Sequence, residues 1–276
     1  MNKRIVSYFA LMVLMLSVTA AKSQTMNNAP LDGAYEHKDR PPQIAMAYPY
    51  LREADVMWEK RVWRVIDVRE KQNLPFKNPI EPFIKILIDG INSGEITAYG
   101  SNNIDSFGAP MTIADVNKIG AGTDTISVVD TSGNEQRKVV NKVLDYNKIT
   151  KFRLKEDWVF DKQRSMMIVR ILGIEPVLDV FNEDGSLRGE TPMFWIYYPD
   201  IRKVLVTHEI FNNENDAMKL SWDDLFEARM FSSYIFKESN VYDRRIQDYA
   251  TGIDGLLESD RIKNDIFAYE HDVWSF

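Results

Sequence analysis

The sequence predicts an α+β fold, with an antiparallel sheet core at about residues 157–211 flanked by N-terminal and C-terminal helices. The first observation behind this prediction is a series of three short runs rich in β-branched and aromatic residues, each closed by turn residues, at 166–172, 194–198 and 204–207. The second is that apolar residues at helical spacing precede and follow this stretch. Strands in series with short links form an antiparallel meander, and helices grouped at its two ends favour α+β over an alternating α/β fold.

The first 23 residues have the organisation of a secretory signal peptide. A charged start at Lys3-Arg4 precedes an apolar run at 5–16 and small residues that offer cleavage sites, Ala20, Ala21 and Ser23. The apolar run is shorter than the ~20 residues that span a bilayer. We therefore predict an exported, soluble protein of the bacterial periplasm rather than an anchored one or a buried N-terminal helix. The chain has no cysteine, so the predicted fold depends on its apolar core and not on disulfides.

Charge is distributed unevenly along the chain. The formal net charge is −7, and residues 209–276 carry 15 Asp and Glu against 7 Lys and Arg. Residues 137–164 instead hold nine Lys and Arg and only four acids. An acidic chain argues against nucleic acid as a partner. A local basic segment together with an acidic C-terminal quarter favours contacts with proteins.

Residues 24–50 are predicted to form an extended N-terminal arm before an α+β domain at 51–276. The arm is polar and contains several prolines, and its last residues alternate apolar side chains at Ile44, Met46, Tyr48 and Tyr50. Such alternation allows the arm to add to a sheet edge or to dock on a neighbour. The other interpretation, a flexible terminus, stays open.

Two helices are predicted before the sheet core. The first is at 55–66, where apolar residues and Arg61 fall at helical spacing, Asp55 is placed to cap it and 73–75 to end it. Its tryptophans and arginines resemble a nucleic-acid strip, but a helix that packs its tryptophans on a sheet fits an acidic exported protein better. The second helix is opened by Pro79 and Pro82 and carries an apolar stripe from 83 to 91, with Gly94 just past its end.

The segment from 95 to 164 is predicted to contain short elements and then a hairpin. We expect a strand at 95–99, a helix capped by Thr112 and ended by Gly120, and a strand at 125–129 before a turn at 132–134. The turn at 161–164 should then fold Trp158 and Phe160 back against Met166 and Ile168.

The C-terminal part, about 213–276, is predicted to be helical and acidic. Ser221 with Asp224 three residues later forms a capping-box pattern at the start of an apolar face that runs from 222 to 236. A second helix is expected at 242–253, ended near Gly252 to Gly255, and the spacing of Ile262, Ile266 and Tyr269 indicates a third.

No enzymatic, cofactor or metal signature is found in the sequence. The glycines at 120–123 lack the lysine and serine or threonine of a phosphate loop, and adjacent acids such as Asp223-Asp224 point apart on a helix or a strand. Among the histidines only His208, beside Glu209, supports a site hypothesis, and a satisfied surface histidine is the simpler reading. An exported cell-wall hydrolase with acids from separate loops, or a soluble periplasmic binding protein, remains as the alternative function.

Four blocks of sequence resemble the GldN/PorN family. They are 56–67, 155–164 with the strand that follows, 194–199 and 221–226, and the similarity covers roughly 48–249. The resemblance implies a non-enzymatic periplasmic component of the gliding-motility and type IX secretion machinery of Bacteroidota. It implies a ring formed with a GldK/PorK-type outer-membrane lipoprotein, and contact with the periplasmic part of a GldM/PorM-type motor protein. It carries over no catalytic, cofactor or binding residues.

A ring requires an interface in which one surface of a subunit meets a different surface of the next. The charge distribution supplies two candidate faces for such contacts between copies or with the lipoprotein. The candidate interface residues are Lys148, Lys151, Arg153 and Lys155 on the basic side and Asp223, Asp224 and Glu227 on the acidic side. Both groups can equally be ordinary solvated faces.

Overall fold

The computed structural model divides the chain into two units, Met1–Pro41 and Pro42–Phe276, and the description below concerns the second. It describes residues 44–101, 104–119, 144–182, 184–212, 215 and 217–274, with the backbone alone at 123–129 and 135–141, and Ala34 from the first unit. The predicted signal peptide at 1–23 therefore lies outside the described residues. So does the arm before Ile44, apart from Ala34.

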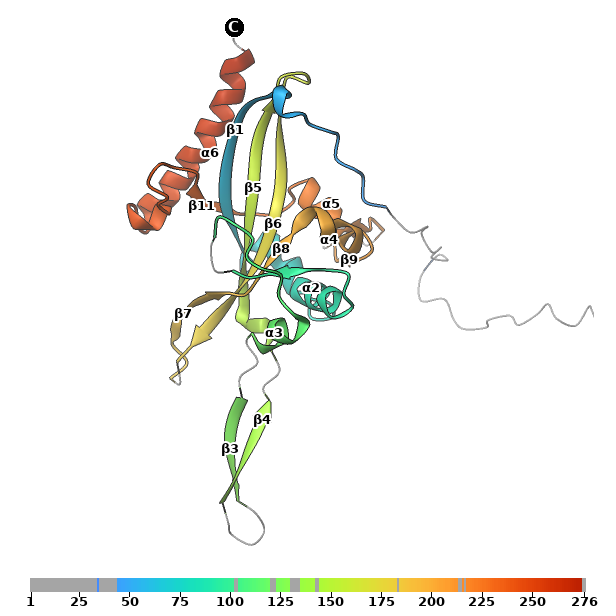
Figure 1. Cartoon of the computed structure of the whole chain (residues 1–276), viewed down its shortest axis with the longest axis vertical. Coiled ribbons are helices and arrows are strands. Elements are labelled where there is room, and N and C mark those ends of the chain that lie inside the picture. Colours follow the sequence, from blue (N-terminus) through green and yellow to red (C-terminus); the bar gives the residue numbers. More distant parts are fainter. Residues whose placement is uncertain are drawn as a thin grey trace, which may run out of the picture. The chain divides into compact units, whose positions relative to one another are not determined.

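Seven strands of the described chain form one antiparallel sheet in the order β11-β1-β5-β6-β8-β2, with β7 paired to β6. Figure 1 shows β1, β5 and β6 as three long, curved strands that run together through the molecule. The α+β prediction is confirmed. The strands of this sheet are β1 (Val56–Asp67), β2 (Ala98–Tyr99), β5 (Ile149–Asp161), β6 (Met166–Phe181), β7 (Leu187–Pro192), β8 (Trp195–Tyr197) and β11 (Tyr234–Glu238).

The segment predicted as the first helix is strand β1, so that prediction is wrong. β1 lies antiparallel to β5 along its whole length, from Val56 opposite Asp161 to Asp67 opposite Lys151. Its second half, 62–66, is buried on both faces of the sheet. A strand buried on both faces has a continuous apolar run, and such a run contains helical spacings by chance. Pairing with β5, ninety residues away in sequence, decides the conformation here.

The predicted hairpin at the centre of the sheet is confirmed, with a register that differs by one residue. Phe160 lies opposite Met167 and Trp158 opposite Val169, because the turn extends to Ser165. The backbone amide of Gln163 donates to Asp161 Oδ1 at 2.9 Å. β6 continues past Gly173, where we expected it to stop. A Cβ at Gly173 would meet the rings of Phe107 and Trp195 at 3.0 Å, so the glycine permits close packing there rather than a turn.

The helices on the N-terminal side and their caps agree with the sequence. Helix α2 (Phe83–Asn92) is preceded by Pro82 and followed by Gly94, whose φ of 79° is left-handed. Helix α3 (Ile113–Lys118) begins at Thr112, whose hydroxyl accepts from the Asp115 amide at 3.2 Å. Strands β3 (Thr123–Val129) and β4 (Glu135–Asn141) form a separate hairpin, whose predicted turn lies outside the described residues.

Helix α4 (Tyr198–Leu205) corrects the prediction of a strand at 204–207. Pro199 occupies the first turn, where its fixed φ suits a helix. Val204 and Leu205 are buried as the last members of a helical stripe that also includes Ile201. The three-strand meander is therefore a hairpin followed by short strands and a helix.

The C-terminal part contains less helix than predicted before residue 253 and more after it. Helix α5 (Trp222–Glu227) has the expected capping box between Ser221 and Asp224, but it ends where Arg229 takes a φ of 53°. The rest of the predicted apolar face is a turn and loop at 228–233 followed by the start of β11. The predicted second helix is a turn with a 3₁₀ segment, and the long helix α6 (Ile253–Trp274) begins where that helix was expected to end. The remaining elements are β9 (Glu209–Ile210), β10 (Leu220–Ser221), η2 (Glu53–Asp55), η3 (Lys71–Lys77), η4 (Tyr146–Lys148) and η5 (Ile246–Asp248).

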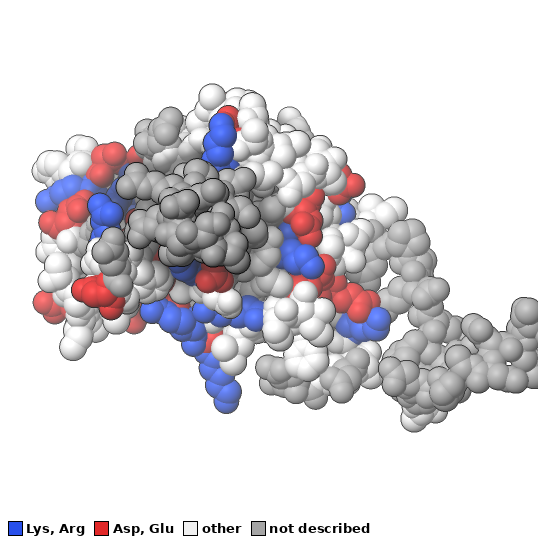
Figure 2. All heavy atoms as spheres, turned by 90° about the horizontal axis from the view of Figure 1, so that it is seen from below, with Lys and Arg blue, Asp and Glu red and all other residues white. Residues whose placement is uncertain are grey.

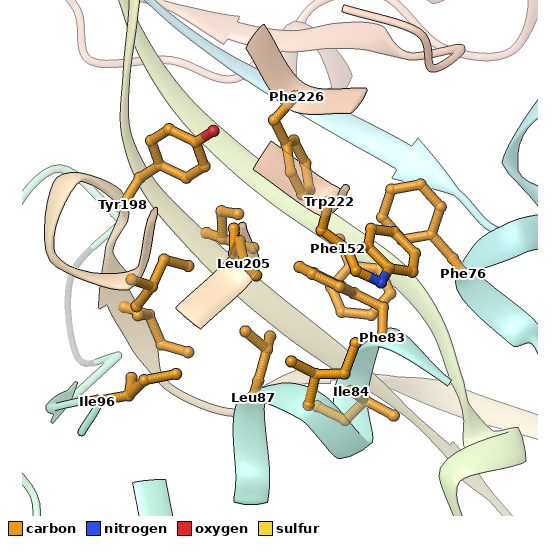
Figure 3. Packing of buried hydrophobic residues seen from close by; sticks show 14 of the residues in the cluster. Phe76, Phe83, Ile84, Leu87, Ile96, Phe152, Tyr198, Leu205, Trp222 and Phe226 are labelled. Carbon is orange, nitrogen blue, oxygen red and sulfur yellow. The ribbon is translucent and has the colours of Figure 1, made fainter. Parts of the chain in front are cut away.

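Two apolar clusters hold the helices on the sheet. The main cluster joins α2, α4, α5 and η3 to β5 and β6, and Figure 3 shows its aromatic centre. There the ring of Phe83 lies 5.2 Å from Phe152 and 4.5 Å from Trp222. The α6 cluster is smaller and packs one stripe of α6 on β1, β5 and β11; its buried members are Val62, Trp158, Ile235, Ile246, Ile262 and Ile266.

Candidate interaction surfaces

The arm segment, Ile44–Tyr50, contains no helix or strand, and Tyr48 is the side chain through which it docks on its own chain. The ring of Tyr48 lies between two guanidinium groups, 4.0 Å from Arg170 and 4.3 Å from Arg202, and its hydroxyl donates to the Glu227 carboxylate. Ile44, Met46 and Tyr50 remain 82–90% exposed. The alternation seen in the sequence therefore separates one anchoring side chain from three exposed ones.

The residues that hold Tyr48 also bind the backbone of the arm segment. Arg202 donates from Nη1 to the Met46 carbonyl at 2.6 Å, and Arg170 donates to the Pro49 carbonyl at 3.3 Å. Recognition of two carbonyls and one ring suits an extended segment of chain. We call this site, formed by Arg170, Tyr198, Arg202, Asp223 and Glu227, the arm clamp.

The centre of the arm clamp is a buried, bidentate ion pair. Arg202 Nε and Nη2 donate to the two Asp223 oxygens at 2.8 and 2.9 Å, and the Tyr198 hydroxyl lies 3.2 Å from Asp223 Oδ1. Arg202 and Asp223 are both buried. Helices α4 and α5 place them, because Tyr198 and Arg202 are one turn apart on α4 and Asp223 is in the first turn of α5.

Protonation in the arm clamp is fixed around neutral pH. Burial, with a smaller effect of the hydrogen bond to Glu227, raises the pKa of Tyr48, and burial followed by the charge of Asp223 raises the pKa of Tyr198. Burial acts to lower the pKa of Arg202, but the hydrogen bonds with Asp223 together with the charges of Tyr48, Asp223 and Glu227 outweigh it, and the pKa is raised overall. The two phenols therefore donate as neutral groups next to a permanent cation. A cavity of about 620 Å³ adjoins the clamp and is lined by residues that include Met46, Glu95, Thr97 and Lys203.

A second surface lies on the sheet face opposite Phe152 and Leu154, since alternate residues of a strand point to opposite faces. It is a cavity of about 370 Å³ between β5, β11 and the first turn of α6, which we call the basic groove. Its charged and aromatic lining residues are Lys151, Arg153, Glu190, Tyr234, Phe236 and Arg245.

Two of the cations in the basic groove have acidic partners. Lys151 pairs with Glu190, and Arg153 Nη1 lies 3.1 Å from Glu175 Oε2 beneath the groove. Burial raises the pKa of Glu175, although Ser101 and Arg153 oppose the shift. Within the described part of the chain Arg245 forms no ion pair at contact distance, but its charge acts on the carboxylates of Glu175 and Asp243.

The structure divides the seven residues proposed from the sequence among several environments. Lys151 and Arg153 meet in the basic groove, and Asp223 and Glu227 meet in the arm clamp. Asp224 caps α5 through the Ser221 hydroxyl at 2.7 Å, and Lys148 ends η4 in a half-buried position. The two charged groups therefore also serve inside one subunit.

Lys155 is buried in the sheet rather than displayed to a partner. Its ammonium donates to the Asp105 carbonyl at 2.5 Å, and burial lowers its pKa. Lys237, which is 2% exposed, donates to Asp105 Oδ1 at 2.6 Å, while Trp63 Nε1 donates to the Ile104 carbonyl at 2.9 Å. These bonds hold the loop that follows β2 across the sheet.

The sequence reasoning did not select Arg170, Tyr198 or Arg202. Arg202 was missed because part of α4 was assigned to a strand, although a helical reading places Arg202 one turn after Tyr198 and on its buried side. His208, the one histidine considered, lies with Nδ1 3.1 Å from Glu81 Oε1. The described residues contain no group of three or more His, Cys, Asp or Glu side chains able to hold a metal ion.

The fold and these surfaces describe an antiparallel sheet framework with two charged surfaces, one of which holds an extended segment of its own chain. Comparison with protein families gives the particular assignment. The family described as "Gliding motility associated protein GldN" matches residues 51–275, and the chain belongs to this family. Among curated proteins no match was found. None of the helices described for this chain is both long and apolar enough to cross a membrane.

Proposed function

We propose that this protein is a non-enzymatic scaffold subunit of the type IX secretion and gliding-motility apparatus, and that it acts by binding. In this proposal it lies in the periplasm, at the inner face of the outer membrane. It forms a ring with a GldK/PorK-type lipoprotein and contacts the periplasmic part of a GldM/PorM-type motor protein. The signal-like sequence at 1–23 supports export.

The observation that carries this proposal is the extent of the family match. It covers 51–275, and so includes the whole sheet and all the helices of the described unit rather than a local motif. The chain therefore shares its whole described fold with the family, and the proposed role is assigned to the entire fold rather than to one motif. The arm clamp adds support, because a site that binds two backbone carbonyls and one tyrosine ring is suited to holding protein segments.

The ring interface is proposed to use the charged groups of the basic segment and of α5. Lys148 and Lys151 are half-buried and retain exposed surface, and Glu227 is exposed at the edge of the arm clamp. Lys155 is omitted from a test of this interface because its burial would make a charge reversal unfold the sheet locally. Changing Lys148 and Lys151 together to glutamate should weaken assembly and reduce its dependence on salt.

Fractionation of cells that produce the native protein tests the scaffold role. A scaffold should sediment with the outer membrane in a large assembly, and affinity purification should recover the lipoprotein and the motor protein with it. Recovery of the protein alone in the soluble periplasmic fraction would overturn the proposal and favour an enzyme or a small-molecule binding protein. Assembly of the Lys148 and Lys151 double variant at wild-type strength would remove the charged groups from the interface while leaving the scaffold role intact.

A further inference from the structure

The basic groove has the shape and lining of a site for an extended peptide segment. β11 is the outermost strand of the sheet, so no further strand of the described chain covers this side of the groove. Its walls come from β5, β11 and residues 245–256, which include η5 and the first turn of α6. We propose that the basic groove binds an acidic, extended segment of a partner protein.

The positive charge of the groove indicates that the bound segment should be negatively charged. Three cations line it and one acid, Glu190, does so with them. Glu175 lies beneath, pairs with Arg153 and also acts on Arg245, so the three cations of the lining exceed Glu190 and Glu175 by one positive charge. Glu190 and Glu175 already hold the side chains of Lys151 and Arg153 in place. Binding of a carboxylate would therefore cost little additional side-chain entropy.

The apolar lining of the groove indicates that the bound segment should also carry apolar side chains. Tyr234 and Phe236 lie two residues apart on β11, and Ile246 of η5 and Leu256 of α6 line the same groove. Arg153 is placed over the Phe236 ring at 5.5 Å. An extended chain sends alternate side chains to opposite sides. A segment that alternates acidic and apolar residues therefore satisfies the cations and the apolar walls together.

On the face of the molecule that Figure 2 shows from below, lysine and arginine side chains are interspersed with aspartate and glutamate. Mixed charge of this kind cancels over the Debye length of ~8 Å at physiological salt. Recognition of an acidic segment should therefore depend on the cations that line the groove.

Binding of a synthetic peptide to the full-length protein tests this inference. The probe is a labelled peptide of about ten residues that alternates glutamate with leucine, long enough to cross the groove at ~3.3 Å per residue. Fluorescence anisotropy at low salt should detect binding that weakens as salt is raised, and a matched peptide with lysine in place of glutamate should not bind. Equal binding of the two peptides, or binding to neither, would overturn the proposal.

Two neighbouring arginines supply a matched pair of variants. Arg245→Glu removes the excess charge of the groove and should lower the affinity for the glutamate peptide about tenfold or more, which corresponds to ~1.4 kcal/mol. Arg244→Glu makes the same change of charge one residue earlier, where the side chain stacks on Tyr242 and Tyr249 and does not line the groove. It should leave the affinity within about twofold. Equal losses in both variants would show that net charge and not the groove binds the peptide.

The inference rests on the proposed role as a binding protein, and its failure can be told apart from failure of that role. Peptide affinity is measured on the isolated chain, whereas the scaffold role is measured by sedimentation with the outer membrane. Thermal melting of both arginine variants should match the native protein, since neither arginine is buried. A groove that fails to bind the peptide in a protein that still sediments would reject this inference alone.

Discussion

Helices α2 and α6 pack against the same sheet, but they differ in the fraction of their residues that is buried. α2 has ten residues, of which seven are buried, and six of these belong to the main cluster. α6 has 22 residues, of which Ser259, Ile262 and Ile266 are buried. Exposed ion pairs from Arg261 to Glu258 and Asp265 support α6 along its surface, and such pairs contribute only ~0.3–0.5 kcal/mol each.

This difference teaches where the stability of the molecule resides. The main cluster surrounds the apolar face of α2 with helices and strands, so the α2 side chains that belong to it are at most 7% exposed. The α6 cluster covers one stripe of a long helix, and Ile253, Leu256, Leu257 and Trp274 stay more than half exposed. We therefore expect the sheet with α2, α4 and α5 to form the stable unit, and α6 to be the element that opens at lower cost.

The largest expected loss of stability follows from removing an aromatic ring on the buried face of α2. Phe83→Ala should lower the free energy of unfolding by about 3–5 kcal/mol, because the ring is fully buried among four other aromatic rings and leaves a cavity. Chemical denaturation followed by circular dichroism measures this loss. A loss below about 1 kcal/mol would show that the main cluster is not the stable centre.

A smaller loss is expected from the matching change under α6. Ile262→Ala should cost about 2–3 kcal/mol, at the low end of the range for buried isoleucine, since the α6 cluster lies at the edge of the fold and can partly close. Hydrogen exchange should show the amides of α6 opening well below the global free energy of unfolding, with those of α2 protected up to it. Exchange of both helices at the same free energy would contradict the comparison.

The sequence predicted those parts of the fold that local interactions determine. The caps at Thr112 and Ser221, the extent of α2 and the hairpin turn at 161–164 each depend on residues within a few positions, and each was predicted. β1 and β11 were assigned to helices because their conformation depends on strand partners far away in sequence. Apolar spacing alone does not distinguish a fully buried strand from a helix.

The candidate surfaces show the same division. Charge counting selected Lys151, Arg153, Asp223 and Glu227, which the structure does place at the two surfaces. It could not identify Arg245 as a third cation of the basic groove, nor Tyr48 as the side chain that Glu227 holds. The bond from Tyr48 to Glu227 joins residues 179 positions apart, so composition along the chain carries no record of it.

The arm segment extends the comparison, since Tyr48 and two backbone hydrogen bonds attach it beside the main cluster. Tyr48→Ala removes both cation–π contacts and the bond to Glu227, and should cost about 1 kcal/mol, because the arm contributes little to the core. Limited proteolysis should cut the variant within 44–50 faster than the native protein. Tyr48→Phe keeps the ring and serves as the control, with an intermediate rate. An unchanged rate in Tyr48→Ala would show that the backbone bonds from Arg202 and Arg170 suffice to hold the arm.

The smallest effect on stability is expected from a substitution on the exposed side of α6, opposite the stripe that contains Ile262. Leu257 is 62% exposed, so truncation to alanine removes little buried surface and replaces leucine by the best helix former. The free energy of unfolding should change by less than about 0.5 kcal/mol. Measured beside Ile262→Ala under the same conditions, this variant separates the covered stripe of α6 from its free side. A loss as large as that of Ile262→Ala would mean that a second surface covers Leu257 in solution, which a shift in sedimentation velocity of the native protein would then reveal.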